Sequence, residues 1–295
     1  MAAFSPLPGD AGVESEAQTD ADQFARAALN RALFALDEVT LSGDRSALQR
    51  RIAVVAADLA PEKAAGLAVG TAAASDAVHA RAVVAAALGK RDPQAGAALI
   101  ASTRPLLAGI YNENQRAAEL AFVCLQWAEF DPAAALEAVG AMEHAELREY
   151  AWAEIARQAP EAARQNLQNA GLPRAQREAR LAALLPSLAK IDLSLGLALT
   201  EEIYDPITKS SVLAEISYSL PAVEALQVAR RIPDPSLGAF AVNAAITRLA
   251  AQDAEAALAA LDSLPGEREN ATAAVAAEIA VYDRPRAMAL MERIF

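Results

Sequence analysis

A chain of 295 residues that contains 78 alanines and carries a formal net charge of −12 is poorly suited to a β-sheet. Alanine is the strongest helix former, whereas the aromatic residues that strands favour make up only 5% of the chain. Nucleic acids and anionic membrane surfaces both require clustered positive charge, which this acidic sequence lacks. The composition therefore predicts an all-α protein with neither kind of partner.

The residue types that carry most catalytic chemistry are scarce. His79 and His144 are the two histidines, and neither lies in a nucleophile or metal-binding motif. Cys124 is the single cysteine, which excludes an internal disulfide and a cysteine-based metal cluster. No Gly-rich phosphate loop, Gly-x-Ser-x-Gly or His-Glu-x-x-His motif is present. We expect no catalytic residues, metal or cofactor, although carboxylates from distant segments could still converge.

Three parts are expected along the chain. Residues 1–19 contain proline, glycine and acidic residues without periodicity, which predicts a disordered acidic tail. The tail lacks the basic start and the apolar core of a signal peptide, so a cytoplasmic location is expected unless a leader was removed. Residues 20–60 show helical spacing and predict an N-terminal helix pair that caps the rest. Residues 61–295 predict a helical-repeat array.

The repeat is visible as a series of similar starts. In chain order these are Pro61, Asp92, Asp131, Pro160, Asp192, Pro221, Asp253 and Asp283. Successive starts are separated by 31, 39, 29, 32, 29, 32 and 30 residues. The fourth residue after each start is small in seven of the eight repeats, with Arg164 as the exception, which predicts a close contact between helices. About thirty residues accommodate two helices and two turns, and such pairs normally stack into a solenoid.

Proline and aspartate mark the turns and the irregular places. Asp205-Pro206 and Asp234-Pro235 stand between the two helices of a repeat, where aspartate caps the free N–H groups and proline occupies the first helical position. Pro105, inside the 39-residue repeat, predicts a kink or an inserted turn. Pro186 is expected to distort a second helix in the same way.

This pattern resembles the short HEAT-like repeats of the α-solenoid superfamily over about residues 61–295. The Val-Arg pair that usually follows the turn in such repeats is absent, since Asp205-Pro206 leads to Ile207-Thr208-Lys209. Tetratricopeptide repeats are less similar, because the period is too short and their Trp, Gly, Tyr and Phe positions are missing. The HEAT-like resemblance implies an α-solenoid of about eight to nine stacked helix pairs, a right-handed superhelical array that binds other proteins.

Two groups of residues are candidates for partner binding. Trp127, Tyr150 and Trp152 belong to an aromatic-rich stretch, and tryptophan and tyrosine dominate interface hot spots. Packing around the irregular 39-residue repeat is the competing explanation. Arg174, Arg177 and Arg180 recur every three residues and predict a stripe that could hold a carboxylate-rich partner. Glu178 among them also fits an ordinary solvated helix face.

The C-terminal segment carries more large apolar residues than one helix face can bury. Residues 283–295 supply a single helix that contains Met288, Leu290, Met291, Ile294 and Phe295. The inner face of a helix takes about three residues in seven. We therefore expect Ile294 and Phe295 to contact another chain, either a second copy of this protein or a different subunit.

The sequence leaves two functions open. The first is a non-enzymatic protein–protein interaction scaffold, or an accessory subunit of a larger assembly. The alternative is an enzyme or a small-ligand-binding protein that uses the concave groove of the helical array. A cluster of carboxylates or histidine in one part of the groove would favour the alternative, and a broad groove without such a cluster would favour the scaffold.

Overall fold

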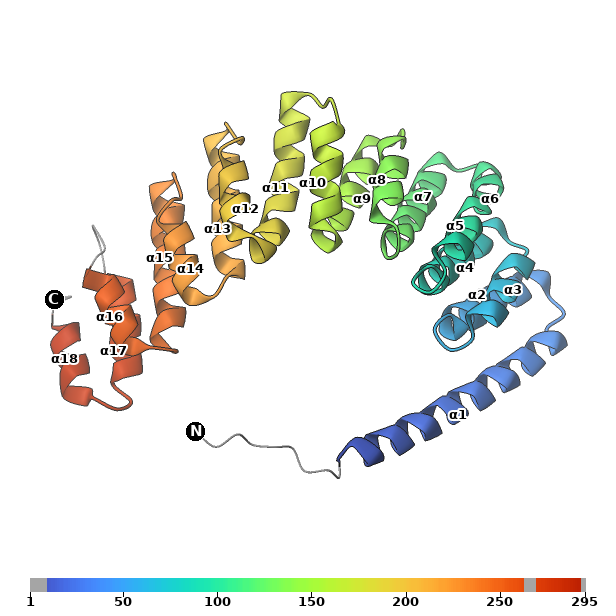
Figure 1. Cartoon of the computed structure of the whole chain (residues 1–295), viewed down its shortest axis with the longest axis horizontal. Helices are drawn as coiled ribbons and strands as arrows, with labels where there is room; N and C mark the ends of the chain where they lie inside the picture. Colours follow the sequence, from blue (N-terminus) through green and yellow to red (C-terminus); the bar gives the residue numbers. More distant parts are fainter. Residues whose placement is uncertain (1–9, 263–268, 293–295) are drawn as a thin grey trace. The chain divides into compact units, whose positions relative to one another are not determined.

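The computed structural model describes residues 10–262 and 269–292. In these two ranges 18 helices follow one another and no strand occurs (Figure 1). The all-α prediction is therefore confirmed. None of the helices in the described ranges combines the length and the apolar composition that crossing a membrane requires.

The chain divides into two compact units, which meet in sequence between Ile155 and Ala156. The helices of the first unit are α1 (Asp10–Glu38), α2 (Ser42–Ala56), α3 (Pro61–Gly70), α4 (Ala74–Gly89), α5 (Pro93–Ala101), α6 (Arg104–Ala108), α7 (Glu113–Ala128), α8 (Pro132–Gly140) and α9 (Ala145–Gln158) up to Ile155. The helices of the second unit are α10 (Pro160–Asn169), α11 (Arg174–Ile191), α12 (Leu193–Thr200), α13 (Pro206–Ser219), α14 (Ala222–Ala229), α15 (Pro235–Ala250), α16 (Ala254–Asp262), α17 (Glu269–Ile279) and α18 (Arg284–Met291).

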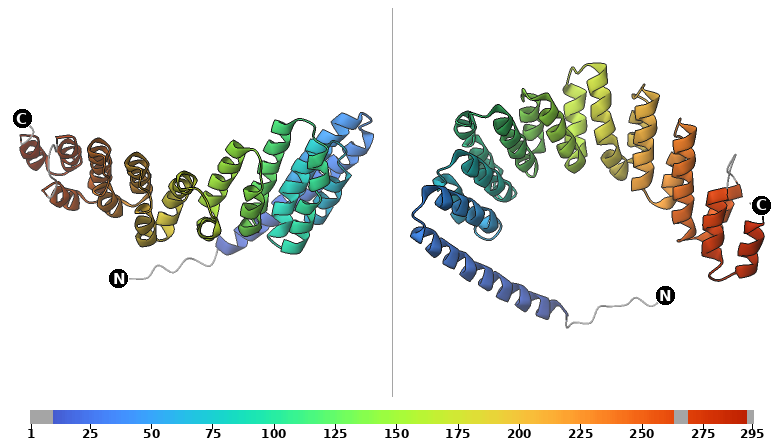
Figure 2. Two further views of the ribbon diagram at one scale, coloured as in Figure 1. Left: turned by 90° about the horizontal axis from the view of Figure 1, so that it is seen from above. Right: turned by 180° about the vertical axis from the view of Figure 1, so that it is seen from behind.

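From α2 onwards long and short helices alternate inside each unit, apart from the extra short helix α6, and they pack in a repeating order. Successive long helices contact one another: α2 and α4, then α4 and α7, in the first unit, and α11, α13, α15 and α17 in succession in the second. The short helices α3, α5, α8, α12, α14, α16 and α18 each pack against the long helix before them. Figure 2 shows the same alternation from two further sides. Sequence-adjacent helix pairs are therefore in contact, as expected for a helical repeat.

The turn from a long helix to a short one has the same construction in every repeat. The connection contains one to four residues, and its last residue is the cap, whose carbonyl accepts a hydrogen bond from the amide four residues later. The eight caps are Ala60, Asp92, Asp131, Ala159, Asp192, Pro221, Asp253 and Asp283. At the five aspartates the side chain also accepts a hydrogen bond from the amide three residues later. The cap therefore satisfies N–H groups that a helix start leaves without partners.

The structure corrects the repeat register at two places. Pro61 and Pro160 are the first residues of their helices, so the caps are the preceding alanines, Ala60 and Ala159. In the corrected register the fourth residue after the cap is buried alanine or glycine in all eight repeats: Ala64, Gly96, Ala135, Ala163, Gly196, Ala225, Ala257 and Ala287. Arg164 is no longer an exception. At Gly96 and Gly196 the short helix lies close against the preceding long helix, as predicted.

Residues 10–19, which were expected to belong to the tail, are helical in the structure. Helix α1 begins at Asp10, ten residues before the expected start, and residues 1–9 lie outside the described ranges. The tail was predicted because apolar residues do not recur at helical spacing in residues 1–19. Residues 11–21 are nevertheless rich in alanine, glutamate and glutamine, which form helices well without an apolar face.

The two proline irregularities have different outcomes. Near Pro105 the chain leaves α5 at Ala101 and forms the separate short helix α6, so the predicted inserted turn is confirmed. At Pro186 the helix does not end. Helix α11 continues through this residue to Ile191, and Pro186 is itself buried.

Candidate protein-binding surface

The aromatic residues predicted to bind a partner occupy different environments. Trp152 on α9 is only 1% exposed and lies in the interior, as the competing packing explanation requires. Trp127 on α7 is half-buried and packs against the core of the first unit, where its Nε1 atom has no hydrogen-bond partner. Large indole rings fill space that alanine cannot, which is the competing packing explanation. Tyr150 remains 53% exposed and available.

The predicted arginine stripe does not form on one exposed face. Arg180 is only 5% exposed, which contradicts its role in a surface stripe. The reason is the helical repeat of 3.6 residues, because each step of three residues turns the side chain back by about 60°. Arg174 and Arg180 are therefore about 120° apart around α11, and the second of them points into the protein.

Arg177 holds two parts of the second unit together. Its guanidinium donates to a carboxylate oxygen of Glu202 at 2.6 Å and to the carbonyl of Leu167 at 3.2 Å. It also belongs to a recurring basic position, the fourth residue after the cap of a long helix, which contains Arg45, Arg116, Arg148, Arg177 and Lys209. All four arginines donate to a carbonyl of the preceding segment. Their role in this structure is to attach the start of a long helix to the chain before it.

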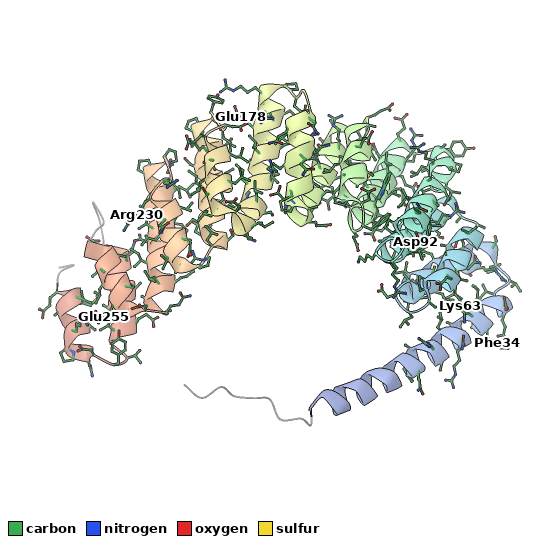
Figure 3. The ribbon with its side chains drawn as sticks, in the orientation of Figure 1. Phe34, Lys63, Asp92, Glu178, Arg230 and Glu255 are labelled. Carbon is green, nitrogen blue, oxygen red and sulfur yellow. The ribbon has the colours of Figure 1, made fainter. Side chains whose placement is uncertain are left out.

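Arg174 is exposed but already has partners within its own unit. Its guanidinium carbon lies 4.0 Å from the centre of the Tyr204 ring, and its Nε donates to Glu178 at 2.8 Å. Glu178, labelled in Figure 3, also accepts a hydrogen bond from the backbone N–H of Asp205. The hydrogen bond from Arg174 is the main cause of a lowered pKa at Glu178. These contacts fasten the turn between α12 and α13.

The C-terminal candidates lie partly outside the described ranges. Ile294 and Phe295 are among the residues that the structure does not describe. On α18, Leu290 is buried and Met288 is exposed. A contact between this end and another chain stays a prediction.

A polar cluster that the sequence did not predict spans three long helices of the first unit. Arg50 on α2 donates to Asp76 on α4 at 2.8 Å, and Ser75 on α4 donates to Glu119 on α7. The His79 ring stacks on the Phe122 ring with centres 4.2 Å apart. Burial and the nearby Arg50 lower the pKa of His79, while Glu119 and Asp76 act in the opposite direction. No group of three or more His, Cys, Asp or Glu in residues 10–262 and 269–292 is placed to hold a metal ion.

Two separate hollows that the sequence did not predict lie on α13, α15 and α17 of the second unit, and we call the surface that contains both the α13–α15 groove. Its first hollow has a volume of about 340 Å³ and lies at the starts of α13 and α15. The residues that line it are Pro206, Ile207, Ser210, Ser211, Pro233, Asp234, Pro235 and Leu237. Ile207 is largely exposed, so the hollow offers an apolar surface beside two helix starts.

The second hollow of the α13–α15 groove is larger and lies further along α15. Its volume is about 580 Å³, and it is lined by Tyr218, Phe240, Asn243, Ala244, Thr247, Arg248 and Asn270. The rings of Tyr218 and Phe240 meet edge to face with centres 6.4 Å apart. They are 42% and 66% exposed, respectively. Exposed aromatic rings beside amide side chains are typical of a surface that binds another protein.

The signal for this surface was present in the sequence but was not recognised. On α15 the buried positions Gly238, Ala241, Ala245 and Leu249 define the inner side of the helix. Phe240 lies off that side, where a polar residue would be expected. The aromatic-rich stretch that contains Trp127, Tyr150 and Trp152 gives a stronger signal in the sequence. Of these three residues, Trp127 packs against the core and Trp152 lies in the interior.

Comparison of the chain with protein-family models, with curated proteins and with solved structures found no match. The fold defines a class, an all-α protein of successive packed helix pairs.

Proposed function

We propose that this protein is a non-enzymatic interaction scaffold, or an accessory subunit of a larger assembly, built as an α-solenoid of HEAT-like repeats. It binds an extended segment of a partner protein in the α13–α15 groove. The exposed edge-to-face pair of Tyr218 and Phe240 is the observation that carries this proposal. Two rings of this size left open to water on neighbouring helices are costly unless a partner covers them.

The repeat architecture supports the HEAT-like part of the proposal. A single cap residue and a buried small residue recur in all eight repeats. The recurring basic residue after the caps of the long helices is the feature most similar to the Val-Arg pair of HEAT-like repeats. Lys209 takes this place in the segment Asp205-Pro206-Ile207-Thr208-Lys209, so the departure from the family pattern is partial.

Affinity capture with the full chain tests the proposal. The purified protein is incubated with its native extract, and the captured proteins are identified by mass spectrometry. The double variant Tyr218→Ser, Phe240→Ser should lose the specific partner. The matched control is Tyr111→Ser, which removes a fully exposed ring from the first unit and should retain the partner. Equal capture by the wild type and the double variant would contradict binding in the groove.

The polar cluster of the first unit favours a second candidate function, small-ligand binding. Asp76, His79 and Glu119 lie together on α4 and α7, and this is the kind of cluster that distinguishes a ligand site from a plain scaffold surface. In a thermal-shift screen of small metabolites, a true ligand should raise the Tm of the wild type but not that of His79→Ala. If every compound that raises the Tm acts equally on both proteins, this candidate is excluded.

A further inference from the structure

We propose that the partner segment bound in the α13–α15 groove carries a lysine or arginine, whose cation lies between Glu215 and the rings of Tyr218 and Phe240. This inference rests on the proposed function and specifies the chemistry of the partner. The lysine or arginine would distinguish this segment from other apolar segments that could enter the groove.

Glu215 lies between the two hollows of the groove. Along α13, Ser211, Glu215 and Tyr218 are spaced four and three residues apart, so they share one exposed face. Ser211 lines the first hollow and Tyr218 lines the second. A segment that extends from one hollow to the other therefore passes Glu215.

The length of the groove fits a short extended peptide. On α15 the lining residues run from Pro235 in the first hollow to Arg248 in the second. Thirteen residues of helix span about 20 Å, which corresponds to about six residues of extended chain. Asn243 and Asn270 present amide groups that can donate to and accept from the peptide backbone.

On α13, the charge that is left without an ion-pair partner is negative and favours a cationic group of the partner. Glu215 is exposed and makes no ion pair within the part of the chain that the structure describes. Lys209, the other charged residue of α13, is paired with Glu201 at 2.6 Å. The Arg248 guanidinium donates to the carbonyls of Ser217, Tyr218 and Leu220 at 3.1–3.2 Å, so it is directed towards the end of α13.

The two hollows differ in charge, because Asp234 lines the first and Arg248 lines the second. Asp234 lines the first hollow, and its carboxylate already caps α15 by accepting from the amide of Leu237. The net charge of −12 adds a long-range preference for cations. An acidic or phosphorylated segment would therefore meet the negative charges of Glu215 and Asp234 at the first hollow and between the two hollows.

The aromatic pair strengthens this preference. The face of an aromatic ring attracts a cation, and the methylene stem of lysine or arginine packs on the same surface. Tyr218 is one turn from Glu215 on α13, so one side chain of the partner can reach both. An apolar neighbour in the partner segment would fill the first hollow beside Ile207.

Selection from a displayed library of random twelve-residue peptides tests the inference on the full chain. Peptides that bind the wild type should be enriched in lysine or arginine next to an apolar residue. For a selected peptide, Glu215→Gln should weaken binding about fivefold, the effect of about 1 kcal/mol. Glu215→Arg should reverse the selection towards acidic peptides. The matched control Glu62→Gln changes an exposed glutamate of the first unit and should have no effect.

Each outcome separates the two proposals. Peptides that depend on Tyr218 and Phe240 but contain no excess of basic residues would overturn the inference and leave the scaffold proposal standing. If the selected peptides bind the double variant Tyr218→Ser, Phe240→Ser as tightly as the wild type, binding in the groove is contradicted. A library that yields no binder would contradict it as well. Circular dichroism of each variant confirms that the helices and the thermal midpoint are unchanged, since the mutated residues are exposed.

Discussion

At Gly96 a short helix begins so close to the preceding long helix that no side chain fits. A Cβ atom there would lie 2.6 Å from the Cα of Gly89 and 3.0 Å from the carbonyl oxygen of Ala85. At Gly196, in the second unit, it would lie 2.9 Å from the Cβ of Ala189. These are backbone or backbone-fixed atoms that cannot swing aside. The small residue at this position of every repeat therefore sets how closely the two helices approach.

We expect Gly96→Ala to destabilise the protein by about 1–3 kcal/mol, the usual effect of overpacking, although alanine is the better helix former. Urea denaturation followed by circular dichroism measures this. The matched control is Gly66→Ala on α3, where nothing lies within 4 Å of the added atom. This change should stabilise by up to about 1 kcal/mol, the helix-propensity difference. The close-approach argument fails if both variants gain stability.

The turn from a long to a short helix depends on its cap residue. The caps differ in whether their side chain accepts a hydrogen bond from the start of the short helix. Asp131 and Ala159 have nearly the same backbone, with φ, ψ of −143°, 76° and −132°, 67°. Asp131 accepts a hydrogen bond from the amide of Ala134, whereas Ala159 has no side-chain acceptor. The alanine caps are therefore the weak turns of the repeat, although their backbone geometry is already correct.

We expect Ala159→Asp to stabilise the protein by about 0.5–1 kcal/mol, because the new carboxylate accepts from free amides at the start of α10. The reverse change in the same unit, Asp192→Ala, removes the hydrogen bond from the amide of Leu195 and should cost about 1 kcal/mol. Thermal unfolding of the two variants beside the wild type measures both effects. A loss of stability in Ala159→Asp would show that its backbone does not accept a side-chain cap.

Across the whole molecule, contacts connect mainly helices that are close in sequence. Within each unit a long helix packs on its neighbours in the chain, and no single large core collects all the helices. In such repeats stability is approximately the sum of local terms and nearest-neighbour interfaces. A local defect should therefore open the structure locally.

We expect Gly96→Ala to lower the hydrogen-exchange protection of α4 and α5 while α14 to α17 keep wild-type protection. Exchange of backbone amides measured by mass spectrometry resolves these helices separately. Gly196→Ala provides the complementary control, with the loss of protection near α11 and α12. Equal loss along the entire chain in both variants would show that the protein unfolds as one cooperative body.

The sequence by itself determined the features that depend on near neighbours in the chain. Alanine content determined the helices, and the recurring Asp or Pro starts determined where the short helices begin, within one residue. The error at Pro61 and Pro160 arose because proline occupies either the cap, as at Pro221, or the first helical position. Whether proline is the cap or the first helical residue depends on which carbonyl accepts the first hydrogen bond of the helix. The sequence does not show this hydrogen bond.

Only the tertiary structure decided which side chains meet and which face water. Tyr218 and Phe240 are 22 residues apart and meet because α13 packs beside α15. Arg180 and Trp152 look like surface residues by type, yet the neighbouring helices enclose them. Helix formation follows from local backbone hydrogen bonds, whereas burial follows from the rotation and spacing of each helix against its neighbours. That second set of contacts is absent from any local pattern, so the site emerged only from the packed helices.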